Sequence, residues 1–192
     1  MSSKVKGIAT YTIALQHFRI TQSIQDARMV LVEYHTPVLF HAAPSNIDKL
    51  DQLQRSFLHE LGIEEAVAFL DFNFPPLSIR RNIGMLGFLH KRVLGRAHPC
   101  FSALFPFATN HGNGHSKSLA THAGNFQELL LKRSLFALVR VYNQLPQYVI
   151  DLDDISLFQS ALTTFAKNEC NNGRQYWQHT FDPASNVDDQ MA

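Results

Sequence analysis

Three closely spaced histidines are the first residues whose types and spacing could do chemistry. His111, His115 and His122 are separated by three and six residues. Imidazoles at such intervals can meet on one metal ion, but a stable site needs three or four ligands held in a defined geometry. No neighbouring carboxylate or cysteine completes the set. We therefore expect no metal site and no cofactor.

Two pairs of adjacent aspartates could hold magnesium. Asp153 with Asp154, and Asp188 with Asp189, supply the carboxylates that this ion prefers. Polymerases, however, place such a pair on a tight hairpin behind an aromatic residue and add a third carboxylate. The first pair instead follows a leucine where an apolar helical pattern begins, a position at which acidic side chains cap exposed amides. We interpret it as a helix cap and the second pair as a solubilising element.

The sequence indicates neither a phosphate-binding loop nor a catalytic nucleophile. Residues 112–118 (GNGHSKS) hold the residue types of a phosphate-binding loop in the wrong order, since no glycine directly precedes Lys117. Cys100 lies in an apolar context without an activating partner, and no Gly-x-Ser-x-Gly motif occurs. Cys170 is the only other cysteine and is distant in sequence, which argues against a disulfide framework or a zinc ribbon. No catalytic residue is predicted.

A cluster of cationic residues in the middle of the chain offers a plausible mechanism for binding phosphate groups. Between Asp71 and Glu128 the chain holds six Lys and Arg, five His and no acid, although its formal net charge is only +1. Arginine's forked donors suit phosphate oxygens, and we expect no acid to lie nearby and neutralise them. The alternative is a solvated helix face. We predict contact with the nucleic-acid backbone, rather than base reading, through the following residues: Arg80, Arg81, Lys91, Arg92 and Arg96, with Lys132, Arg133 and Arg140 extending the surface.

The composition is that of a folded domain. Hydrophobic residues make up 45% of the 192 residues, charged residues make up 17%, and there are 15 Phe. This balance excludes an intrinsically disordered chain. No apolar run is long enough to span a bilayer, and no apolar stretch follows residues 1–7 as in a signal peptide. We expect an intracellular protein, cytoplasmic or nuclear, without a membrane partner.

Hydrophobic periodicity predicts an all-α fold, an irregular bundle of about six helices with a long central loop. The expected helices cover 8–20, 22–43 with a break near Pro37, 44–61, 77–94, 126–145 and a last segment that begins at Asp153 or Asp154, with a short helical turn region at 63–72. Gly62 and Gly95 are expected to end two of them. His90 lies on the apolar side of its helix, which is typical of a hydrogen-bonded core histidine.

The same pattern divides the chain into five parts. These are an N-terminal segment 1–21, a helical region 22–107 with the basic helix 77–96, a loop 108–125, a C-terminal helical pair 126–167 and a flexible tail 168–192. The loop is rich in Gly, Asn, His and Ser and shows no period. The tail is polar apart from a few aromatic residues, so we expect it to fray.

Seven short sequence segments occur in an order that is found in a known protein family. They are residues 32–37 (VEYHTP), 50–58 (LDQLQRSFL), 76–81 (PLSIRR), 86–95 (LGFLHKRVLG), 132–136 (KRSLF), 140–146 (RVYNQLP) and 155–159 (ISLFQ). The first four resemble the region after the catalytic domain in reverse transcriptases of non-LTR (LINE-like, jockey-like) retrotransposons. The last three are similar to the segment that closes such polyproteins. Tyr142 stands where the family usually has a tryptophan, and the resemblance covers about residues 24–165.

The resemblance implies a helical thumb and post-thumb region, which in the family helps to hold template RNA and the RNA:DNA product beside the polymerase palm. It implies RNA or an RNA:DNA hybrid as partner, together with a palm domain. The aromatic-x-Asp-Asp hairpin of the palm has no counterpart here, and neither do the fingers, endonuclease and RNase H domains. By this comparison the chain is not an enzyme by itself and looks like the terminal fragment of an element's reading frame.

Two other interpretations remain open at this point. The many phenylalanines in a chain with few charges favour a helical protein-interaction module whose exposed aromatics dock on a partner. A decayed retroelement relic with no activity of its own fits the same residues. Salt-dependent binding to nucleic acid distinguishes the leading hypothesis from both.

Overall fold

The computed structural model describes residues 42, 44–109, 115–121 and 134–183. Within these ranges the chain forms seven α-helices, one short 3-10 helix and no β-strand, which confirms the all-α prediction. The elements are α4 (Pro44–Glu60), α5 (Glu65–Phe72), α6 (Leu77–Val93), α7 (Pro99–Leu104), α9 (Leu135–Asn143), α10 (Gln147–Ile150), α11 (Ile155–Asn171) and η1 (Trp177–His179).

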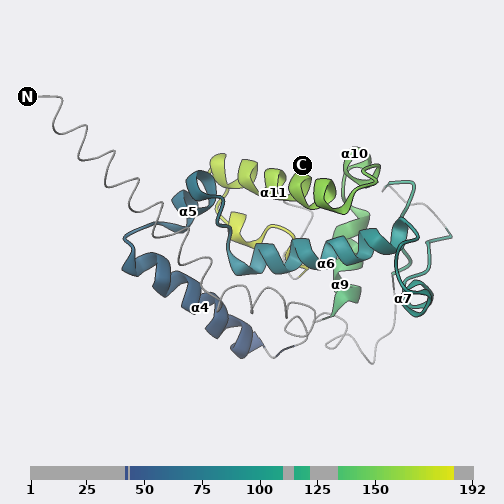
Figure 1. Cartoon of the computed structure of the whole chain (residues 1–192), viewed down its shortest axis with the longest axis horizontal. Helices are drawn as coiled ribbons and strands as arrows, with labels where there is room; N and C mark the ends of the chain where they lie inside the picture. The colour runs from purple at the N-terminus through teal and green to yellow at the C-terminus, as the bar shows by residue number, and fades with distance from the viewer. Residues whose placement is uncertain (1–41, 43, 110–114, 122–133, 184–192) are drawn as a thin grey trace, which may run out of the picture.

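Helix α6 is the element around which the others pack. It contacts α4, α9, α11 and η1, and α11 runs alongside it (Figure 1). Helices α4 and α5 lie toward one end of α6, and α7 lies toward the other (Figure 1). Apolar residues of α6 such as Ile79, Leu86 and Leu89 are completely buried in the main hydrophobic core. The position of α6 therefore decides where its cations are presented.

The helix boundaries follow the local signals in the sequence. Gly62, after α4, and Gly95, after α6, have φ values of 67° and 69°. Side chains disfavour this left-handed region, so glycine is suited to both helix ends. At the start of α11, the Asp154 carboxylate accepts a hydrogen bond from the Leu157 backbone amide at 2.9 Å. The capping role expected for this aspartate is confirmed.

The flexible tail expected from residue 168 onward is wrong for residues 168–183. Helix α11 continues to Asn171, and the two aromatic residues Trp177 and Phe181 are 8% and 3% exposed. The Trp177 ring stacks on Phe69 with centroids 5.7 Å apart, and Phe181 lies 5.8 Å from Phe165. Isolated aromatics produce no periodic signal, but tertiary contacts bury them.

Part of the expected central loop is also packed. Leu119 is 1% exposed and makes an isolated antiparallel bridge with Phe107. The Asn143 side chain holds it further, since its Oδ1 accepts from the Leu119 amide at 2.9 Å and its Nδ2 donates to the Leu119 carbonyl at 2.8 Å. Residues 115–121 of the loop 108–125 thus belong to the folded body. Several predictions fall outside the described residues. They are the helix over 8–20, the helix over 22–43 apart from residue 42, the part of 126–145 before Ser134, and the pair Asp188 and Asp189.

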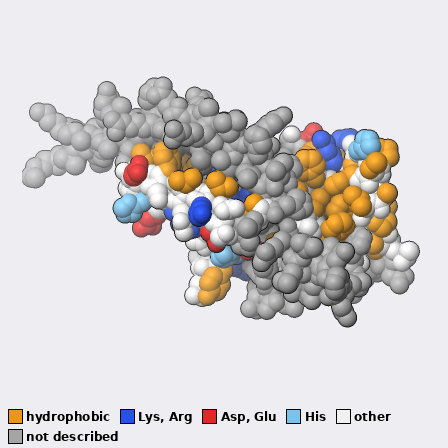
Figure 2. Space-filling view, turned by 90° about the horizontal axis from the view of Figure 1, so that it is seen from below, with side chains coloured by type: hydrophobic (Ala, Val, Ile, Leu, Met, Phe, Trp, Pro, Cys, Tyr) orange, Lys and Arg blue, Asp and Glu red, His pale blue; other side chains and the backbone are white. Residues whose placement is uncertain are grey.

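The surface around α7 is rich in apolar side chains. Figure 2 shows hydrophobic side chains gathered at the end of the molecule that carries α7, with cationic and histidine side chains beside them. Leu104 is 54% exposed and Phe107 is 45% exposed. In the sequence this region is the short apolar piece from Phe101 to Phe107. A helix of six residues cannot bury all of its faces, so part of this piece stays exposed.

His90 is the main buried polar side chain of the core and is completely shielded from solvent. Its Nε2 lies 2.6 Å from the Leu152 carbonyl oxygen, and its Nδ1 lies 3.0 Å from the Tyr142 hydroxyl. A carbonyl oxygen only accepts, so the arrangement assigns the proton to Nε2 and makes Nδ1 the acceptor from Tyr142. The ring also stacks on Phe158 with centroids 4.0 Å apart. The core role expected for His90 is confirmed.

The burial of His90 makes the stability of the fold depend on pH. It lowers the pKa of His90 below its ordinary value, and the nearby cation Lys117 and the His115 ring lower it further, while the Leu152 hydrogen bond and Asp153 oppose the shift. The unfolded chain then binds a proton that folded His90 excludes, so stability falls as the pH decreases below about 6.5.

We expect His90→Phe to reduce this acid sensitivity, because it removes the titrating group. Urea unfolding of wild type and variant at pH values above and below about 6.5 measures the change in unfolding free energy with pH. His59→Gln, which replaces an exposed histidine of α4, is the matched control and should retain the wild-type dependence. An unchanged dependence in His90→Phe contradicts the assignment.

Candidate nucleic-acid interface

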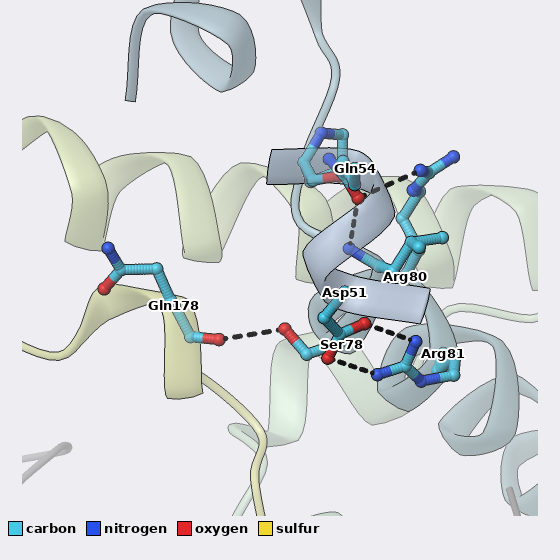
Figure 3. A network of polar contacts seen from close by, with 8 residues as sticks. Asp51, Gln54, Ser78, Arg80, Arg81 and Gln178 are labelled. Carbon is cyan, nitrogen blue, oxygen red and sulfur yellow. Dashed lines mark hydrogen bonds and ion pairs between the residues drawn. The ribbon is translucent and has the colours of Figure 1, made fainter. Parts of the chain in front are cut away.

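Arg81 is buried in an ion pair and is not presented to solvent. Its residue exposure is 5%, and its two terminal nitrogens lie 2.7 and 2.9 Å from the two carboxylate oxygens of Asp51 (Figure 3). Asp51 belongs to α4, 30 residues earlier and outside the acid-free block. The expectation that no nearby acid neutralises the basic helix is therefore wrong at Arg81. This arginine joins α4 to α6.

The Arg80 side chain is largely enclosed where α4 packs against the start of α6. Its guanidinium lies 4.8 Å from the centre of the Phe74 ring, and Nη2 donates to Gln54 Oε1 at 3.5 Å (Figure 3). Burial, with a smaller contribution from the neighbouring Arg81, lowers the pKa of Arg80 to about 10. It stays cationic at neutral pH, but its contacts contribute mainly to the fold.

Gln54 is the polar residue that organises this corner, and it is only 2% exposed. Its Oε1 accepts from the Leu77 amide at 2.8 Å, and its Nε2 donates to the Pro75 carbonyl at 3.1 Å. The first turn of α6 thereby receives its cap from α4 and not from a residue in front of the helix. Nearby, the Ser78 hydroxyl donates to the Gln178 carbonyl at 3.3 Å and ties the C-terminal segment to α6 (Figure 3).

Three of the predicted cations gather where α6 ends. Lys91 and Arg96 are exposed, and Arg92 is partly exposed. Arg92 Nε donates to the Phe105 carbonyl at 2.9 Å and to the Ser102 carbonyl at 3.3 Å, and Arg96 Nη1 donates to the Asp153 carbonyl at 2.8 Å. Among the described residues none of the three forms an ion pair with a carboxylate. We refer to Lys91, Arg92 and Arg96 as the α6 terminal cluster.

Of the remaining predicted cations, one is on another helix and two lie outside the described ranges. Arg140 is exposed on α9, a helix that packs against α6. Lys132 and Arg133 lie outside the described residues. The structure thus divides the eight predicted residues into buried Arg81, largely enclosed Arg80, the α6 terminal cluster, one exposed residue on α9 and two undescribed residues.

The histidine-rich stretch contributes to the core. His115 is 4% exposed and its Nε2 donates to the Tyr142 carbonyl at 2.9 Å, while His111 and His122 lie outside the described residues. In the described ranges, no group of three or more His, Cys, Asp or Glu is arranged to hold a metal ion. None of the helices described is long and apolar enough to span a bilayer.

Comparisons of this chain with protein-family models, with curated proteins and with solved structures give no match.

Replacing Asp51 tests the structural role of Arg81. Asp51→Ala leaves the buried guanidinium without its partner, so we expect the free energy of unfolding to fall by about 3 kcal/mol. Glu60→Ala removes an exposed acid from the same helix and should change it by less than about 0.5 kcal/mol. Urea unfolding followed by circular dichroism measures both. Equal effects of the two substitutions rule out a structural ion pair.

Proposed function

We propose that this chain is a non-catalytic helical region of a retroelement reverse transcriptase that contacts the nucleic-acid backbone. The observation that carries the proposal is the α6 terminal cluster, three cations within six residues that no described carboxylate neutralises. The ordered phrases that resemble the post-catalytic region, together with an all-α fold, support the assignment. The expected partner is RNA or an RNA:DNA hybrid, held beside a palm domain.

The anchoring of the two arginines favours phosphate binding. Arg92 and Arg96 each donate one N–H to a backbone carbonyl, which restricts the side chain and leaves other N–H groups for a ligand. A side chain held in place loses less rotamer entropy when it binds. Lys91 adds a flexible charge beside them. With about three phosphate contacts, the logarithm of affinity should fall with the logarithm of salt concentration with a slope of about −2 to −3.

The decisive variant reverses charge at the exposed positions. We expect Lys91→Glu with Arg96→Glu to weaken binding to an RNA:DNA hybrid at low salt by about ten-fold or more and to reduce the salt slope by about two. Fluorescence anisotropy with labelled hybrid, single-stranded RNA and duplex DNA, at low and moderate salt, gives both quantities. Arg81 is unsuitable for this test because its reversal breaks the ion pair with Asp51.

The matched control is Lys49→Glu with Arg55→Glu, which changes the net charge equally at exposed positions of α4. It should retain most of the affinity. A wild-type chain that does not bind at low salt overturns the proposal. So does a control that weakens binding as much as the α6 terminal variant, because the effect then reflects net charge and not a site.

A further inference from the structure

The apolar surface at α7 is continuous along a short stretch of chain. Its exposed side chains come from α7 and the turn after it, and we call them the α7 surface: Pro99, Cys100, Ala103, Leu104, Pro106 and Phe107. The two large members, Leu104 and Phe107, keep about half of their area in solvent. Scattered single apolar residues are ordinary on a protein surface, but a cluster of this kind marks a contact site.

The α7 surface rests on a rigid support. Phe105 is 2% exposed beneath it, and its ring centroid lies 4.8 Å from Phe101 and 4.7 Å from Phe136 of α9. Arg92 Nε binds the Ser102 and Phe105 carbonyls and so fixes α7 to α6. On the other side, the Ala120 amide donates to the Pro106 carbonyl at 2.8 Å. A surface held in this way is preorganised for a ligand.

The margin of the α7 surface toward α6 is cationic, and one acid from elsewhere in the chain, Asp153, lies beside it, since its backbone carbonyl accepts from Arg96. The α6 terminal cluster precedes α7 directly in the chain, and the Arg92 guanidinium lies 4.4 Å from the centre of the Phe107 ring. No acidic residue occurs between Asp71 and Glu128, so neither α7 nor the adjoining chain supplies a counter-charge of its own. An apolar centre with a cationic margin is complementary to a ligand that carries apolar side chains and carboxylates.

We propose that the α7 surface docks an acidic amphipathic segment of a partner protein. The partner's apolar side chains cover Leu104 and Phe107, and its carboxylates pair with Lys91 and Arg96. A second copy of this chain is a poorer occupant, because a symmetric contact places the same cations opposite each other. Nucleic acid is also poorer here, since leucine and alanine offer no face for base stacking and the Phe107 ring is already covered on one face by Arg92.

The test uses a display library of random peptides of about 16 residues, roughly four helical turns. After selection on the wild-type chain, we expect enrichment of sequences that combine Asp or Glu with Leu, Phe or Ile. The most enriched peptide is then synthesised with a fluorophore, and its affinity is measured by anisotropy. Its binding should also slow the reaction of exposed Cys100 with a thiol reagent, while Cys170 stays buried and inert.

The variants test the apolar part of the surface. Leu104→Ser, alone or with Phe107→Ser, should weaken peptide binding by about ten-fold or more. Leu104→Ser alone should also leave the affinity for RNA:DNA hybrid unchanged, because it keeps Phe107 against Arg92 of the α6 terminal cluster. Leu53→Ser and Leu157→Ser remove equally exposed leucines elsewhere, at 65% and 59% exposure, and should leave the peptide affinity unchanged. Circular dichroism of each variant checks that it folds, and Leu104→Ser alone avoids disturbing the Arg92 contact.

Four results overturn the proposal. Enriched peptides without acidic residues, or peptides that bind Leu104→Ser as well as wild type, exclude an acidic partner at this surface. Self-association in analytical ultracentrifugation that Leu104→Ser abolishes assigns the surface to a second copy. Loss of hybrid binding in Leu104→Ser assigns it to nucleic acid. Because the nucleic-acid proposal is tested by Lys91→Glu with Arg96→Glu, either proposal can fail without the other.

Discussion

The packing of His90 at the centre of the core is the interaction on which the rest of the structure depends. One ring on α6 binds a hydroxyl from α9 and a carbonyl before α11, and it stacks on a phenylalanine of α11. Both ring nitrogens have partners, so the core contains a polar group without leaving it unsatisfied. Because the two hydrogen bonds are directional, they set the rotation and register of α6 against its neighbours. The outward face of α6 and the position of α7 follow from that register.

The arginines of α6 illustrate how tertiary neighbours assign different tasks to one residue type. At the start of the helix, α4 covers Arg80 and Arg81 and supplies Gln54 and Asp51 as partners. At the end of the helix, the partners of Arg92 and Arg96 are backbone carbonyls, which hold the side chain but do not neutralise its charge. The first pair thus contributes to stability, and the second retains charge for a ligand.

Arg92 connects the two proposed surfaces. It belongs to the α6 terminal cluster, it anchors α7 through two carbonyls, and its guanidinium lies against Phe107. A phosphate or a carboxylate bound at this end of α6 therefore meets an arginine whose position depends on α7. Binding of nucleic acid and of an acidic protein segment at these adjoining surfaces is expected to be coupled, since both draw on the same cations.

The sequence by itself determined the helices and several of their ends, because capping and periodicity act between residues a few positions apart. Gly62, Gly95 and Asp154 were recognisable in this way, and so was the apolar setting of His90. Only the tertiary structure decided which cations remain available, since the partner of Arg81 comes from 30 residues away. The burial of Trp177 likewise depends on Phe69, more than a hundred positions earlier, and no local pattern encodes such a contact.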